Sequence, residues 1–233
     1  MLLAIALWAA VGAAVSPFVY AAIVALPQRA SLRAQLASDL RSPRSLHIPI
    51  MSSLCDLLRK SGDRRTNLRR LVIELGMALI FGWLVWQHGT SWVTFVLSVY
   101  AVIFTLVIFI DLDHHLILNV VLAPAAIFAL LVAPTMPDLN LGRAIVGAVV
   151  GFVLLLLPAL IMPGGLGAGD VKLAGFLGLA VGFPGVLTTL LAGIILGGLV
   201  TAGLLLSRRI GRRDYLPYGP FLITGAVLVI MTW

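Results

Sequence analysis

Two aspartates border apolar segments of the chain, where a carboxylate is costly. Asp111 stands in IFIDLDHHLILN (108–119), and Asp170 stands in GGLGAGDVKL (164–173). A charged side chain costs about 2.5–3.5 kcal/mol at mid-membrane and less toward the interface, so such a residue marks a candidate functional site. Two carboxyl groups that meet in a half-dry cleft share one proton. The ionised group can then activate water while the protonated group polarises a carbonyl, which is the chemistry of an aspartic protease.

Glycines surround Asp170, among them Gly167 and Gly169. Glycine lets backbone approach backbone or substrate without a Cβ in the way, so an extended peptide could dock beside this loop. A phosphate-binding loop is a poor interpretation, because no G-x-G-x-x-G pattern and no G-K-[ST] ending can be laid through the segment. In the structural alternative, the glycines break a helix and Asp170 caps the next one, a role that aspartate performs well and that is compatible with catalysis.

Asp111 has a polar neighbourhood of its own. Asp113 points about 200° away from Asp111 on a helix, so only one of the two can face the bundle interior. Asp111 is the deeper, and we expect Asp113, His114 and His115 at the water interface. The adjacent histidines diverge by about 100° and have no further histidine nearby in sequence, so interface residues are favoured over metal ligands.

Two further charged residues lie at or inside span boundaries. Glu74 either pairs with a basic residue or helps to form the substrate cleft, since both follow from the cost of a buried charge. Lys172 either extends to the lipid headgroups, which is the usual behaviour of such a lysine, or tunes Asp170.

The elements that position these residues are predicted to be membrane helices. The chain has 233 residues, of which 61% are hydrophobic and 11% charged, whereas soluble domains are about 25% charged. Backbone groups in lipid must pair within helices or closed barrels, and no strand-like alternation is present. We therefore predict an all-α polytopic membrane bundle. About eight spans are expected, at 2–26, 71–88, 92–110, 117–135, 143–162, 171–184, 186–206 and 218–233.

The basic residues orient this bundle. Fifteen of the sixteen Lys and Arg residues fall in the loops 28–70 and 207–217 or at Lys172, and Arg143 is the exception. Cytoplasmic loops are rich in Lys and Arg, so this side is predicted to be cytoplasmic and both termini to lie outside. Asp111 and Asp170 are then both expected at the cytoplasmic end of the helical bundle. Arginines beside anionic lipid explain the charge better than a nucleic-acid partner does.

Three regions are expected along the chain. Residues 1–27 form a first helix, which lacks the basic start and cleavage site of a removed signal peptide. Residues 28–70 form a basic cytoplasmic loop, and residues 71–233 form the core. The one cysteine, Cys55, excludes an intrachain disulfide and a cysteine-based zinc site.

The motifs resemble those of the type IV prepilin peptidases, which are membrane aspartic endopeptidases of the GxGD class. The family's G-x-G-D-x-K-L stands here at 167–173, and its Asp-x-Asp-His motif with an Asn ending runs from Asp111 to Asn119. YLPYGPFLITGA resembles the family's P-[FY]-G-P-[FY] segment before the last helix. RRLVIELGMALIFG resembles a segment that carries the family's glutamate, here Glu74. The resemblance covers nearly the whole chain, in order.

The resemblance implies a function. Such enzymes remove the short basic leader of type IV prepilins and pseudopilins at the cytoplasmic face of the bacterial inner membrane. It implies Asp111 and Asp170 as the catalytic pair. Supporting residues in or near the substrate cleft are then Gly167, Gly169, Lys172, Asp113, Asn119 and Glu74.

Two departures from the family pattern concern cofactors and local structure. Bacterial members often bind zinc through paired C-x-x-C motifs in the first cytoplasmic loop, but this loop has only Cys55, so no metal is expected. Many members also methylate the new N-terminus with S-adenosylmethionine. That activity is uncertain here because the loop is degenerate, and proteolysis needs no cofactor. Leu118 replaces a usual proline, which would let the fourth helix start earlier.

Two other functions compete with the protease. A transporter or proton-coupled channel also uses intramembrane acids, but it would spread them through the depth of the membrane. An inactive relative of the family is the other alternative, and it rests on the two departures alone.

Overall fold

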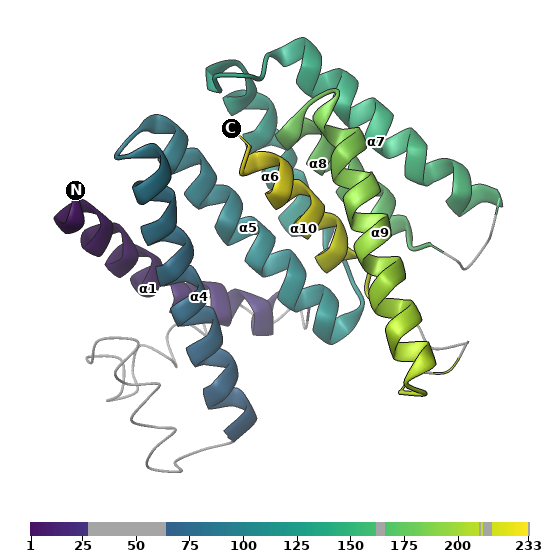
Figure 1. Ribbon diagram of the computed structural model, residues 1–233, viewed down its shortest axis with the longest axis horizontal. Coiled ribbons are helices and arrows are strands. Elements are labelled where there is room, and N and C mark those ends of the chain that lie inside the picture. The colour runs from purple at the N-terminus through teal and green to yellow at the C-terminus, as the bar shows by residue number, and fades with distance from the viewer. Residues whose placement is uncertain (28–63, 162–165, 210, 212–215, 233) are drawn as a thin grey trace. The chain divides into compact units, whose positions relative to one another are not determined.

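The computed structural model describes residues 1–27, 64–161, 166–209, 211 and 216–232. Most of the predicted basic loop, with Cys55, lies outside the described residues, and so do Gly164 and Gly165. All the regular structure in the described part is helical, which confirms the all-α prediction (Figure 1). The elements are α1 (Leu2–Ala25), α4 (Arg64–His88), α5 (Trp92–His114), α6 (Asn119–Val132), the 3-10 helix η2 (Ala133–Thr135), α7 (Leu141–Ile161), α8 (Ala168–Val181), α9 (Gly185–Leu206) and α10 (Gly219–Ile230).

Several helix ends differ from the predicted spans. The helix α4 begins at Arg64, seven residues before the predicted start at 71, and α5 continues past 110 to His114. Apolar runs mark only the part of a helix that suits lipid, whereas arginine is a good helix former and extends a helix into water. Leu118 does not give α6 the earlier start that was predicted, because α6 begins only after this residue. That residue is extended, with φ −80° and ψ 125°, and stands just before the first helical residue.

Four of the described helices are long and apolar enough to cross a membrane alone, namely α1, α5, α7 and α9. The helices α8 and α10 have 14 and 12 residues, whereas a straight crossing takes about 20. The count of eight spans therefore stays a prediction. Exposed leucines and valines on α7, such as Val146, Leu154 and Leu157, suit a hydrocarbon environment that needs no polar cover.

The chain divides into two compact units, Met1–Leu106 and Val107–Trp233. In the first unit α1 packs against α4. The second unit, here called the C-terminal unit, holds the last turns of α5 together with α6 to α10. Its α8 contacts α6, α7, α9 and α10 (Figure 1). This central position explains why a 14-residue helix buries nine of its residues, Asp170 among them.

The tightest packing in the C-terminal unit joins α7 to α8. A Cβ added at Gly147 would meet the carbonyl oxygen of Gly178, and one added at Gly178 would meet that of Gly147. Small residues let membrane helices approach closely and gain van der Waals contact where lipid supplies no hydrophobic drive. This pair sets how α8, and with it Asp170, lies against α7.

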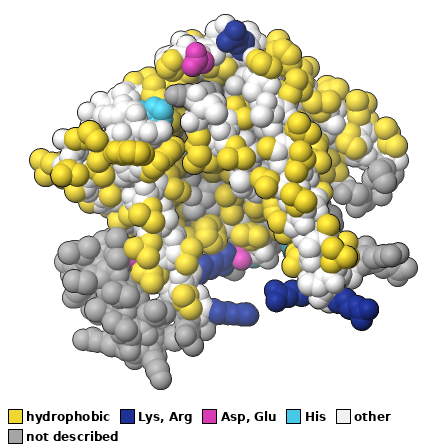
Figure 2. All heavy atoms as spheres, in the orientation of Figure 1, with side chains coloured by type: hydrophobic (Ala, Val, Ile, Leu, Met, Phe, Trp, Pro, Cys, Tyr) yellow, Lys and Arg dark blue, Asp and Glu magenta, His cyan; other side chains and the backbone are white. Residues whose placement is uncertain are grey.

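Charge is unevenly distributed over the described surface. Figure 2 shows hydrophobic side chains over the sides of the helices and basic side chains at the end of α9, where Arg208 and Arg209 lie. Arg143 lies at the start of α7, where its Nη1 donates to the carbonyl oxygen of Asp138 at 3.1 Å.

Candidate active site

Asp111 lies in the last turn of α5 and is 4% exposed. The backbone N–H of Gly219 donates to its Oδ2 at 3.0 Å. Gly219 is the first residue of α10, and a Cβ there would stand 2.6 Å from the same oxygen. The start of the last helix is therefore fitted to this carboxylate, and only glycine allows so close an approach.

Asp170 lies in the first turn of α8 and is 5% exposed. The N–H of Gly167 donates to its Oδ2 at 3.2 Å, and the N–H of Asp170 donates to the carbonyl oxygen of Gly167 at 3.0 Å. This reciprocal pairing resembles a capping box, with Gly167 at the N-cap and the acid three residues later. Asp170 thus does cap its helix, from its third position, and the cap fixes one carboxylate oxygen.

The fold brings the two aspartates together within the C-terminal unit. Their carboxyl groups are close enough to interact electrostatically. The helix α10 links them, because its first residue binds Asp111 while its length packs against α8. In each carboxyl group Oδ2 accepts a backbone N–H, which anchors one oxygen of each acid. Two buried acids that interact in this way favour a state in which the pair holds one proton.

The glycine turn before Asp170 also contacts the first aspartate motif. A Cβ at Gly169 would stand 2.9 Å from the Cβ of Ile117, in the connection between α5 and α6. The missing side chain lets the first turn of α8 lie directly on this connection. The structure therefore gives Gly169 a packing role beside the acids, while its part in substrate docking stays a prediction.

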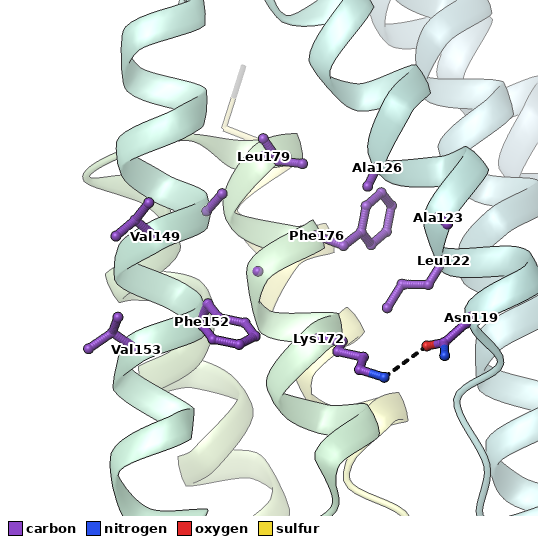
Figure 3. Close-up of a pocket in the computed structure, with 12 residues that line it drawn as sticks. Asn119, Leu122, Ala123, Ala126, Val149, Phe152, Val153, Lys172, Phe176 and Leu179 are labelled. Carbon is purple, nitrogen blue, oxygen red and sulfur yellow. Dashed lines mark hydrogen bonds between the residues drawn. The ribbon is translucent and has the colours of Figure 1, made fainter.

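Lys172 and Asn119 meet on the other face of α8. The Nζ of Lys172 donates to the Oδ1 of Asn119 at 3.1 Å (Figure 3). Both side chains are exposed, in contrast to Asp170, which is two residues from Lys172 and about 200° away around the helix. The pair ties the start of α6 to the start of α8.

The remaining predicted residues are placed as follows. Asp113, His114 and His115 are exposed, as expected for residues at the water interface, and His115 lies close enough to Asp111 to interact with it electrostatically. Glu74 is buried, at 6% exposure, in α4 of the other unit, so its role in a cleft stays a prediction. Within the described ranges, no group of three His, Cys, Asp or Glu side chains could hold a metal ion.

Sequence reasoning missed the contact between Gly219 and Asp111. The segment YLPYGPFLITGA contains this glycine, and its resemblance to a family motif marked it. The segment alone does not show which distant side chain packs against the glycine. The paired glycines of α7 and α8 were missed as well, although Gly147 and Gly151 have the small-xxx-small spacing typical of close membrane helices.

Comparisons with known proteins point to one family. A model described as the type IV leader peptidase family matches residues 98–202, which include Asp111 and Asp170 but not Gly219. A Bacillus subtilis protein named prepilin leader peptidase/N-methyltransferase is 28% identical over 228 residues, which are 94% of this chain and 91% of that protein. Proteins of the same name from Pseudomonas putida and Neisseria gonorrhoeae are 30% and 28% identical, and the matches cover 79% and 78% of this chain. The chain spans 66% and 65% of those two relatives. No solved structure matches.

Proposed function

Because the chain belongs to the type IV leader peptidase family, we propose that it is a membrane aspartic endopeptidase that removes the basic leader of type IV prepilins or pseudopilins. The observation that carries the proposal is a pair of buried carboxyl groups, Asp111 and Asp170, that interact electrostatically and are each held by one backbone N–H. These acids come from different helices of one multi-pass membrane protein.

The proposed reaction uses one proton shared by the two acids. The ionised carboxylate takes a proton from water, and the oxygen of that water attacks the carbonyl carbon of the scissile peptide bond. The other carboxyl group hydrogen-bonds the carbonyl oxygen and stabilises the tetrahedral intermediate. The carbon–nitrogen bond then breaks, and the leaving amine takes up the proton. The N–H groups of Gly219 and Gly167 hold the two Oδ2 atoms and so limit the rotation of both carboxyl groups.

The membrane side is part of the proposal. We place the acids at the cytoplasmic face of the bacterial inner membrane, since fifteen of the sixteen basic residues fall in loops on one predicted side. A leader rich in positive charge would be cut on the side where it is retained. Both acids lie in terminal turns of their helices, whereas a proton relay across the membrane would need acids at mid-depth.

Methyl transfer, the second activity in the names of the relatives, is not proposed for this chain. The first basic loop, with which the family binds zinc, has a single cysteine here, Cys55, and most of that loop lies outside the described residues.

Leader removal is the direct test. The chain is co-expressed with a prepilin-like substrate, and the shorter product is followed by gel shift and N-terminal sequencing. Asp111→Asn and Asp170→Asn should each abolish cleavage, with a loss of at least about 10³-fold, while the protein stays in the membrane. A variant with either change that still cleaves at the normal rate would refute the paired-acid mechanism.

A further inference from the structure

An apolar groove of about 560 Å³ runs along the C-terminal unit between α6 and α7, with α8 as its floor. Figure 3 shows Phe176 and Leu122 on one side and Phe152 and Val149 on the other. The groove is lined by Asn119, Leu122, Ala123, Ala126, Ala148, Val149, Phe152, Val153, Lys172, Gly175, Phe176 and Leu179.

The polar side chains that line this groove lie at one end of it. Among its lining residues only Lys172 and Asn119 carry polar side chains, and no carboxylate is present. These two residues lie together at one end, bonded to each other at 3.1 Å (Figure 3). A single cation at the mouth of an apolar groove complements a molecule that has an apolar tail and an anionic head.

The groove lies on the opposite face of α8 from the candidate catalytic group. Lys172 is exposed and Asp170 is buried, and the two side chains point about 200° apart around the helix. A chain that filled the groove would therefore have α8 between itself and the carboxyl group of Asp170. This separation argues against the groove as the seat of the peptide bond that is cut.

The length of the groove also favours a lipid over a protein helix. Along α8 its lining runs from Lys172 to Leu179, which is about 10 Å of helix axis. The hydrocarbon core of a bilayer is about 30 Å thick, so the groove fits within one leaflet of about 15 Å. A membrane-spanning helix would extend well beyond the groove. The part of an acyl chain next to the headgroup would instead lie inside the groove along its whole length.

We propose that this groove binds an anionic phospholipid, with one acyl chain along α8 and the phosphate on Lys172. An ammonium has three N–H donors, and Asn119 accepts one of them, which leaves donors for the phosphate oxygens. Basic pockets between membrane helices bind anionic headgroups for the same reason. The bound lipid would bridge the starts of α6 and α8. The proposal stands on the groove itself and does not depend on the peptidase activity.

Photo-crosslinking of the full-length protein in a non-ionic detergent tests this site. Phosphatidylglycerol with a diazirine in its acyl chain is the probe, and phosphatidylcholine with the same chain is the comparison. We expect phosphatidylglycerol to label peptides of α6 and α7 about fivefold more than phosphatidylcholine does, as one basic contact to an anionic head allows. Equal labelling by the two lipids would overturn the proposal.

Three variants locate the contact. Lys172→Gln should reduce labelling by phosphatidylglycerol to the level of phosphatidylcholine, and Lys172→Arg should restore it. Arg209→Gln removes the same charge from the end of α9, outside the groove, and should leave labelling unchanged. If Lys172→Gln does not fold, Ala123→Leu fills the exposed α6 wall and should abolish labelling by itself. Retained labelling by phosphatidylglycerol in Lys172→Gln or Ala123→Leu would show that the groove does not take an anionic lipid.

Discussion

Gly219→Ala should sharply reduce cleavage without unfolding the protein. The added Cβ would stand 2.6 Å from the Oδ2 of Asp111 and 3.3 Å from its Cγ, whereas unstrained contacts between non-bonded heavy atoms lie near 3.5 Å. The carboxylate would have to move by nearly 1 Å. The backbone of Gly219 can yield little, because Pro220 has its φ fixed near −65°.

The magnitude follows from two effects of that displacement. A hydrogen bond to a charged group contributes about 1.5–3 kcal/mol, and the bond from the N–H of Gly219 would be lengthened or lost. A misplacement of about 1 Å in a reacting group can cost about 10²-fold in rate. We therefore expect kcat to fall by about 10- to 100-fold, with a smaller change in KM.

The assay is cleavage of a purified prepilin-like substrate by the protein in detergent, with thermal melting measured on the same samples. Gly198→Ala is the matched control, because a Cβ at that position of α9 has no heavy atom within 4 Å. The control should keep full activity. Full activity in Gly219→Ala, with unchanged melting, would refute the idea that this glycine fixes the carboxylate of Asp111.

Three other outcomes are expected. Asp113→Asn should reduce cleavage far less than the Asp111 variant, because its exposed carboxyl group points away, and an equal loss would mean that the wrong aspartate was chosen. Gly147→Leu should lower the melting temperature in detergent, because the new side chain would push α7 away from Gly178 of α8. Such overpacking costs about 1–3 kcal/mol of stability. Gly142→Ala, with only the Oδ1 of Asn140 near its Cβ, at 3.4 Å, should not have this effect. Chelators should leave cleavage intact, and inhibition that zinc reverses would contradict the metal-free mechanism.

The sequence by itself determined the all-helical membrane character and singled out the two acids that we propose as catalytic. An apolar run long enough to cross lipid has few alternatives, because every backbone group must pair within its own segment. A carboxylate beside such a run stands out for the same energetic reason. Helix geometry predicted that only one of Asp111 and Asp113 faces the bundle interior, since two residues make about 200° of rotation, and the apolar run directly before Asp111 indicated which one.

Only the tertiary structure decided which distant groups meet. The N–H of Gly219 on the carboxylate of Asp111, the side chain of Asn119 on Lys172, and the glycine contact between α7 and α8 join segments far apart in sequence. Local periodicity describes which face of a helix is apolar but not which helix will cover it. That choice depends on how close two backbones can come, and it is fixed by the shapes of both partners at once.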